Sequence, residues 1–95
     1  MARRQALIIE AGGERFRFYY DLREPSVLHI TRQHGTTPED AIHTFFVGMT
    51  GSWNETHLRF ETRTETHGLY RTRHARDHSA IVIRRFKRGE ESWPD

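Results

Sequence analysis

The side chains in this sequence that could do chemistry are mainly arginines and histidines, and they concentrate in its second half. Between His57 and Arg88 there are nine basic residues and three acidic ones, a net charge of +6, together with four of the seven histidines. Between Gln5 and Thr56 there are four arginines and seven acidic residues, a net charge of −3. Separation of charge within a small chain is typical of a protein that binds a polyanion.

Arginine supplies all but one of the 15 basic residues, and Lys87 is the exception. A planar guanidinium group can bind two phosphate oxygens at once, which favours nucleic acid as the partner. A GC-rich genome would also raise the number of arginines, so composition alone leaves both explanations open.

The arginines alternate with other residues along predicted strands. Arg59 and Arg63 share one face of the first strand, and Arg71 and Arg73 share one face of the second. Side chains on neighbouring strands lie about 5 Å apart, so several guanidinium groups could converge on one phosphate. The structural alternative is a solvated face whose arginines pair with intervening glutamates. The predicted RNA-binding side chains are Arg59, Arg63, Arg71, Arg84, Lys87 and Arg88.

Histidine is the second signal, because it titrates near neutral pH and can act as the base or the acid when RNA is cleaved without a metal. Arginine can stabilise the charge of the transition state. Each histidine also has a structural alternative; His34, for example, precedes Gly35 and could simply cap a helix. The histidines considered for proton transfer are His34, His57, His67, His74 and His78. The predicted catalytic set is His34, His74, Arg73 and Arg85.

Several classes of site are missing from the sequence. It contains no cysteine, which excludes disulfides and thiolate metal sites and favours a cytoplasmic location. HExxH, Walker, GxGxxG and GxSxG motifs are absent, so we expect neither a metal nor a cofactor. No apolar run reaches the roughly 18 residues of a membrane span. The apolar stretch 6–9 is too short for a secretory signal, so we expect no membrane association.

The elements that must position these residues can be predicted from periodicity and turn signals. Alternation over 5–11 and 14–21 around Gly12-Gly13 predicts a β-hairpin. Pro25 is predicted to open a helix that Gly35 closes. Thr37-Pro38 is predicted to start a second helix, which Gly48 and Gly51 stop.

The remaining sequence predicts a three-stranded antiparallel meander over 57–66, 69–76 and 80–88. Ala80–Ile83 is a continuous apolar run, so it is predicted to be the most central strand. The expected fold is therefore a single α+β domain over 1–95 in the order ββααβββ. A basic N-terminal arm over 1–4 and a flexible acidic tail over 89–95 are expected to flank it.

Three stretches resemble the BrnT-like toxins of the RelE superfamily: Tyr20-Asp21, the segment His29–Ala41, and Ile83-Arg84-Arg85. Those toxins carry a "WD…KHG-x-x-x-E-E-A" element followed by three strands, and the resemblance covers roughly residues 19–88. It implies a RelE-like fold and a cofactor-independent ribonuclease toxin that halts translation. It also implies a small antitoxin as partner, with a homodimer or a heterotetramer as the assembly. His34 matches the helix-end histidine of the family, and Arg84 and Arg85 match its final-strand arginine.

Two other functions remain open from the residues alone. The same basic face could belong to a non-catalytic module that binds nucleic acid or an acidic protein. Alternatively, Trp53 and Trp93 could anchor a partner of a small regulatory or structural protein.

Overall fold

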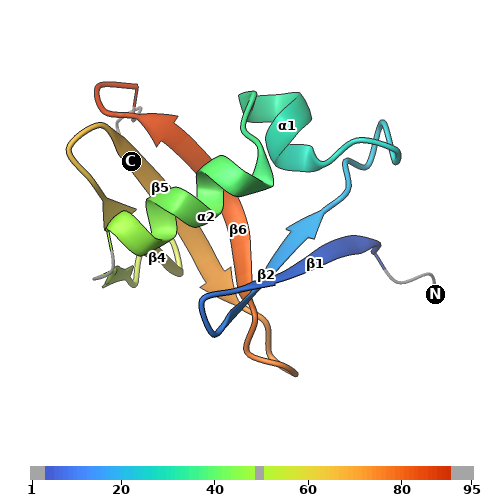
Figure 1. Cartoon of the computed structure of the whole chain (residues 1–95), viewed down its shortest axis with the longest axis horizontal. Helices are drawn as coiled ribbons and strands as arrows, with labels where there is room; N and C mark the ends of the chain where they lie inside the picture. Colours follow the sequence, from blue (N-terminus) through green and yellow to red (C-terminus); the bar gives the residue numbers. More distant parts are fainter. Residues whose placement is uncertain (1–3, 49–50, 91–95) are drawn as a thin grey trace.

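The computed structural model describes residues 4–48 and 51–90. Within these residues the chain forms two layers, a six-stranded sheet and a layer of two helices (Figure 1). The predicted α+β class is confirmed. The elements in chain order are β1 (Ala6–Ala11), β2 (Glu14–Tyr19), α1 (His29–His34), α2 (Pro38–Val47), β3 (Ser52–Asn54), β4 (Arg59–Arg63), β5 (His67–Arg73) and β6 (Ala80–Lys87).

The N-terminal hairpin forms as predicted. Gly12 and Gly13 both have positive φ, 57° and 81°, as a tight two-residue turn requires. Alternation then places Phe16 and Phe18 in the core, where both are fully buried, while Arg17 points to the opposite face. The hairpin therefore supplies one apolar and one polar surface.

Helix α1 is shorter than predicted, because it begins at His29 and not near Pro25. The side chain of Asp21 accepts hydrogen bonds from the backbone N–H groups of Arg23 and Glu24, which turns the chain directly after β2. The backbone N–H of Asp21 also donates to the carbonyl of Val27. Pro25 thus lies inside a turn held by Asp21, and the helix starts one turn later.

Helix α2 follows the predicted capping pattern. Thr37 accepts a hydrogen bond from the backbone N–H of Asp40 at 3.2 Å, and Pro38 is the first helical residue. The rings of Phe45 and Phe46 pack edge-on against Phe16, at centroid distances of 4.9 and 5.9 Å. These contacts attach α2 to the sheet, and the helix ends at Gly48.

The C-terminal part contains one strand more than predicted. The expected strand 57–66 is the shorter β4, and β3 pairs with it antiparallel across a loop in which Leu58 has a φ of 53°. The three residues of β3 are too few to give a clear alternating pattern. β4, β5 and β6 are consecutive antiparallel strands, which confirms the meander.

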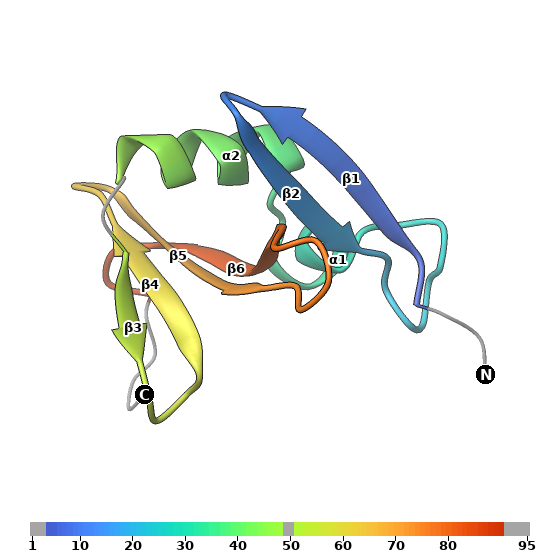
Figure 2. The same ribbon diagram turned by 90° about the horizontal axis from the view of Figure 1, so that it is seen from below.

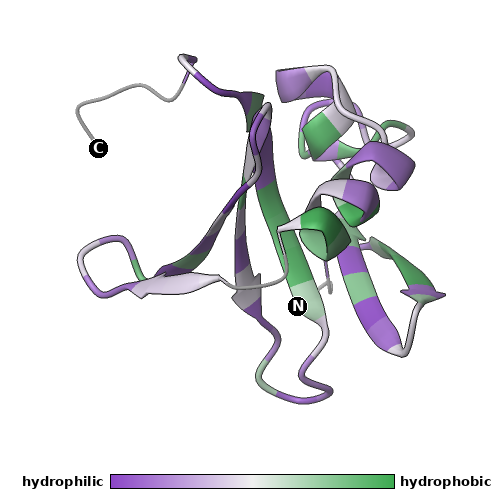
Figure 3. Ribbon diagram, turned by 60° about the vertical axis from the view of Figure 1, so that its left-hand side comes forward, coloured by the Kyte–Doolittle hydropathy of each residue, from purple (hydrophilic) through white to green (hydrophobic). Residues whose placement is uncertain are grey.

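The strand order is β1-β2-β6-β5-β4-β3, so the apolar run of β6 lies in the middle of the sheet, as predicted (Figure 3). β2 and β6 pair in parallel at Phe16↔Ala80 and Arg17↔Ile81. This contact joins the N-terminal hairpin to the meander. β2 and β6 do not pair after these two positions, and α1 contacts both strands.

A bulge in β6 changes the faces of its side chains. Tyr70 pairs with Arg84, but its neighbour Arg71 pairs with Val82, so the register skips Ile83. Val82 and Arg84 consequently lie on opposite faces of the sheet, although two-residue spacing would normally place them on the same one.

The hydrophobic core lies between the sheet and the helices. It consists of the buried residues Phe16, Phe18, Ile30, Ala41, Leu69, Ala80 and Val82. Among the described residues, no helix has the length and hydropathy needed to cross a membrane. Residues 1–3 of the predicted arm and 91–95 of the predicted tail, including Trp93, lie outside the described residues.

Candidate functional site

The two faces of the sheet differ in what lies over them. Helix α2 packs on one face, here called the covered face, and neither described helix lies across the other, the open face (Figure 2). The register assigns residues to each face. Phe16, Ala80 and Arg73 form a row on the covered face, because Phe16 packs against α2. The adjacent row, on the open face, contains Arg17, Ile81 and Thr72.

The predicted arginine cluster is divided between these faces. Arg71 pairs with Phe60, and its guanidinium lies 4.6 Å from the ring centre of Phe45 in α2, on the covered face. Arg73 shares that face and is exposed. The prediction that these arginines join Arg59 and Arg63 is wrong, because the register sets Phe60 opposite Arg71.

On the open face, Arg59 and Arg63 surround a carboxylate. Arg59 and Arg63 both pair with Glu61, at 2.9 and 3.4 Å, and the Arg59 guanidinium stacks on Tyr70 at 3.6 Å. Burial would raise the pKa of Glu61, but hydrogen bonds from Arg59 and Asn54 lower it. This group matches the structural alternative for a strand face more closely than a phosphate site.

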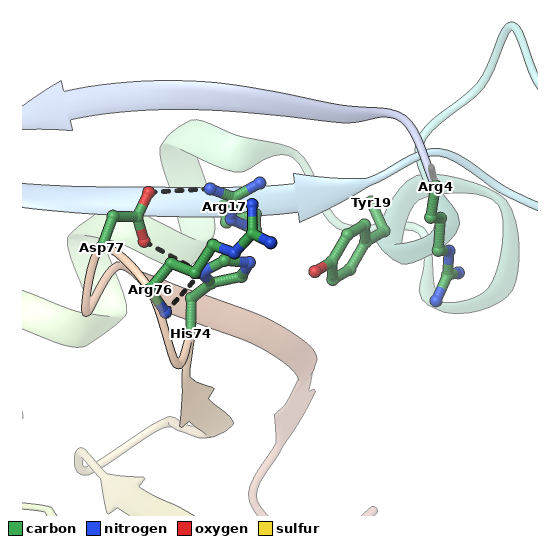
Figure 4. A pocket seen from close by; sticks show the side chains of 6 residues that line it. All are labelled: Arg4, Arg17, Tyr19, His74, Arg76 and Asp77. Atoms are coloured by element: carbon green, nitrogen blue, oxygen red, sulfur yellow. Dashed lines mark hydrogen bonds and ion pairs between the residues drawn. The ribbon is translucent and has the colours of Figure 1, made fainter. Parts of the chain in front are cut away.

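A pocket with positive charge, here called the first basic pocket, lies on the open face beside the β5–β6 loop and has a volume of about 540 Å³ (Figure 4). It contains three guanidinium groups and one imidazole but a single carboxylate. Its lining residues are Arg4, Arg17, Tyr19, His74, Arg76 and Asp77. Because cations outnumber the carboxylate, the pocket suits an anionic ligand.

Asp77 holds Arg17 in position. The Arg17 guanidinium donates to Asp77 Oδ2 at 2.7 Å and to Ser79 Oγ at 3.1 Å. Hydrogen bonds from Ser79, followed by the contact with Arg17, hold the pKa of Asp77 well below its usual range. The single carboxylate is thus ionised at neutral pH and already paired, which leaves Arg4 and Arg76 to meet a ligand.

The β5–β6 loop fixes the orientation of His74. Its Nδ1 lies 3.2 Å from the backbone nitrogen of Arg76 and 3.3 Å from Asp77 Oδ1. With Nδ1 accepting the backbone N–H of Arg76, the neutral ring carries its proton on Nε2. In this tautomer Nε2–H can donate to an anion.

An apolar groove of about 370 Å³ adjoins the first basic pocket and shares Arg4 and Tyr19 with it. The Arg4 guanidinium lies over the Tyr19 ring, 4.6 Å from its centre. The remaining lining residues come from α1, β5 and β6: His29, Ile30, Thr72, Ile81, Val82 and Ile83. The bulge residue Ile83 is 37% exposed and is one of the large apolar side chains open to solvent here.

A second basic pocket, of about 490 Å³, lies beyond the groove near the end of α1. The sequence placed His34, Arg84 and Arg85 in its predicted site, and the structure brings these three together. Arg85 also donates from Nε to Thr44 Oγ1 of α2 at 2.8 Å. The pocket is lined by Gln33, His34, Arg84, Arg85, Phe86 and Glu90.

His34 is electrostatically distinct in this pocket. Partial burial lowers its pKa, and the positive charges of Arg84 and His29 lower it further. The rings of His29 and His34 meet edge-to-face at 5.8 Å, which links the apolar groove to the second basic pocket. At neutral pH His34 is therefore neutral and able to accept a proton.

The three cavities lie in sequence along β6, from the β5–β6 loop past Ile81 and Ile83 to Arg84. The structure does not bring all predicted catalytic residues together: His34 and Arg85 lie in the second basic pocket, His74 in the first, and Arg73 on the covered face. Lys87 and Arg88 are exposed at the end of β6.

Sequence reasoning missed five of the six residues that line the first basic pocket. Arg4 was assigned to an arm, Arg17 and Tyr19 to a hairpin strand, Arg76 to the end of a strand and Asp77 to the link that follows it. The parallel pairing of β2 with β6 brings these segments together, and nothing local in the sequence indicates it. One local indication was available in the sequence: Asp77 follows His74 by three residues, and their side chains lie close together in the loop.

Comparison with known proteins returned no match: no protein-family model, no curated protein and no solved structure is significantly similar to this chain.

Proposed function

We propose that this protein binds RNA on the open face of its sheet, along β6. The observation that carries the proposal is the first basic pocket, where Arg17, Arg76 and His74 lie around one carboxylate that is already paired, and Arg4 lies across Tyr19 from them (Figure 4). Guanidinium groups and an Nε2–H donor along one pocket match the oxygens of a phosphate.

The second basic pocket supports a ligand longer than one phosphate. Ile81 pairs with Thr72 and Arg84 with Tyr70, two residues apart on β5, so at about 3.3 Å per residue Arg84 lies roughly 7 Å further along the sheet. A polyanion that follows β6 contacts both basic pockets. RNA is chosen over other polyanions because of the sequence resemblance to ribonuclease toxins.

RNA affinity should depend on the face from which an arginine projects. Arg76→Gln removes a guanidinium from the first basic pocket and is expected to weaken binding about tenfold, the loss of one charged hydrogen bond. The slope of the logarithm of affinity against the logarithm of salt concentration should fall by about one, the value for one lost phosphate contact. Fluorescence anisotropy with a labelled RNA, measured over a salt series, tests both.

Arg73→Gln is the matched control, because Arg73 is also exposed but lies on the covered face. It should leave affinity and salt dependence unchanged. If both variants lose affinity equally, binding is not confined to the open face. If the wild-type protein binds an acidic protein partner but no RNA, the surface belongs to a protein-binding module.

RNA cleavage is a second candidate function, favoured by the neutral state of His34 next to Arg84 and Arg85. His34 would take the proton from the 2′-hydroxyl, whose oxygen attacks the phosphorus, and the arginines would stabilise the charge that develops on the phosphate. The P–O5′ bond then breaks, and the leaving 5′-oxygen takes a proton from water or from the protonated His34. No metal or cofactor is needed for this arrangement.

Cleavage should therefore proceed in the presence of a chelator and rise with pH through a pKa below 6.5, the ordinary value for histidine. His34→Gln should abolish cleavage without abolishing binding. His43→Gln, an exposed histidine of α2, is the control and should keep full activity. Binding without turnover at any pH would leave a non-catalytic RNA-binding protein.

A toxin that a small antitoxin holds inactive is the cellular role that the sequence resemblance favours. Expression of the active protein should then arrest bacterial growth, and His34→Gln should relieve the arrest. Unimpaired growth on expression of a cleaving enzyme would contradict this role.

A further inference from the structure

We propose that the apolar groove is a subsite for one unstacked nucleobase, held between the two basic pockets. This inference rests on the proposed RNA binding and adds the part of the ligand that the groove takes: a flat heteroaromatic ring from an unpaired nucleotide.

The shape and lining of the groove fit such a ring. Its volume of about 370 Å³ lies at the lower end of the range for small-ligand pockets, about 300–1,000 Å³. Tyr19 supplies an aromatic surface, and Ile81 and Ile83 supply aliphatic contacts. Aromatic side chains beside a cationic track are the usual way in which proteins hold the bases of a single strand.

Tyr19 and Arg4 connect the groove to the phosphate site. Both residues line the groove and the first basic pocket, and the Arg4 guanidinium stacks on the Tyr19 ring at 4.6 Å. A ligand bound in the apolar groove therefore lies directly beside a cationic pocket. This combination matches a nucleotide, whose base and phosphate are joined through the sugar.

The other end of the groove lies next to the second basic pocket. His29 lines the groove, and its ring contacts that of His34 in the second basic pocket. The groove is thus an apolar site with arginines near both of its ends, Arg4 at one and Arg84 and Arg85 in the pocket beyond the other. A nucleotide fits this arrangement, because its base can enter the groove while its sugar carries the phosphates beside the arginines, whereas a lipid tail or an apolar peptide segment offers them no anion.

Thr72 is the polar group that could select among bases. It pairs with Ile81 on the open face, and its side chain lines the otherwise apolar middle of the groove. Its hydroxyl can donate or accept one hydrogen bond. Thr72→Val would remove that hydrogen bond while keeping nearly the same shape.

A base subsite predicts that the protein binds single-stranded RNA more tightly than polyanions that present no free base. A duplex keeps its bases stacked inside, and inorganic polyphosphate has none. We expect the protein to bind a short single-stranded RNA at least tenfold more tightly than a duplex of the same sequence or polyphosphate of equal charge. Competition in a fluorescence anisotropy assay measures all three.

The variant that tests the groove is Ile83→Ser, which should weaken binding of single-stranded RNA about fivefold, near the lower limit for the loss of one base contact. Its affinity for polyphosphate should not change. Ile8→Ser is the matched control, because Ile8 is 41% exposed on β1, outside the groove, and Ile83 is 37% exposed. Thermal unfolding of both variants checks that the fold is kept.

Equal affinity for single-stranded RNA, duplex and polyphosphate, with Ile83→Ser behaving like Ile8→Ser, would overturn the base subsite and leave RNA binding intact. Failure to bind any of the three ligands would overturn the proposed function together with this inference. A loss of affinity for polyphosphate in Ile83→Ser would also overturn the subsite, because it would place the phosphates in the groove.

Discussion

The covered and open faces of the same sheet use arginine in different ways. On the covered face Arg71 lies near the rings of Phe45 and Phe60, and Arg85 donates to Thr44, so these side chains attach the sheet to α2. On the open face Arg17 and Arg76 line a pocket. Arginine content therefore predicts a binding surface only after the face of each residue is known.

The largest contrast between the faces should appear in stability. Phe16→Ala removes a fully buried ring that contacts Phe45 and Phe46, and is expected to cost about 3–5 kcal/mol of unfolding free energy. Ile8→Ala on the open face should change it by no more than about 0.5 kcal/mol. Urea denaturation measures both, and equal losses would show that the open face is also part of the core.

Low pH should destabilise the turn between β2 and α1, which the side chain of Asp21 holds. Burial opposes ionisation of Asp21, but hydrogen bonds from the Glu24 and Arg23 backbone and from His29 lower its pKa to about 2. A carboxyl with a lowered folded-state pKa contributes stability above its unfolded pKa, about 3.9, and loses it as the pH falls through about 2.

Asp21→Asn should therefore lower the midpoint of thermal unfolding at pH 7 by several degrees and remove the corresponding loss of stability between pH 4 and 2. Glu39→Gln, an exposed change in α2, should keep the wild-type profile. A wild-type profile in Asp21→Asn would mean that the Asp21 turn does not stabilise the fold.

Substitution of Arg85 tests whether one side chain has two roles, because Arg85 lines the second basic pocket and also donates a hydrogen bond to α2. Arg85→Ala should lower the unfolding free energy by about 1 kcal/mol, the usual net contribution of a hydrogen bond. A double-mutant cycle with Thr44→Ala isolates this contact. No coupling between the two positions would assign Arg85 to the pocket alone.

The smallest effect is expected for Arg71. Burial lowers the pKa of its guanidinium, and its neighbours are largely aromatic. Replacing a buried charge by a well-packed apolar side chain is often neutral, so Arg71→Met should change stability by less than about 1 kcal/mol. RNA affinity should be unchanged. An affinity loss as large as that of Arg76→Gln would show that the covered face takes part in binding.

Local patterns predicted the elements that local interactions form. The hairpin at Gly12-Gly13, the Thr37 cap of α2 and the central position of Ala80–Ile83 follow from turn chemistry, capping and apolar runs. The start of α1 was missed because Asp21, and not Pro25, determines the turn before it. The candidate His34–Arg84–Arg85 group came from the resemblance and was brought together by the fold.

The division of the arginines could not be predicted, because it depends on register. Shifting a strand by one residue exchanges its faces, and the bulge at Ile83 does this inside β6. The parallel contact of β2 with β6 depends on tertiary packing alone. The first basic pocket needs both the register and this contact, so its residues were found only in the structure.

The parallel contact also affects when binding ability arises during synthesis. Arg17 and Asp77 are 60 positions apart in the chain, yet they share one ion pair in the first basic pocket. Contacts between distant parts of a chain are costly in loop entropy and slow the folding of β-rich domains. In a nascent chain that still lacks β6, β2 pairs with β1 alone and the pocket is incomplete. The first basic pocket should thus form only after β6 has left the ribosome.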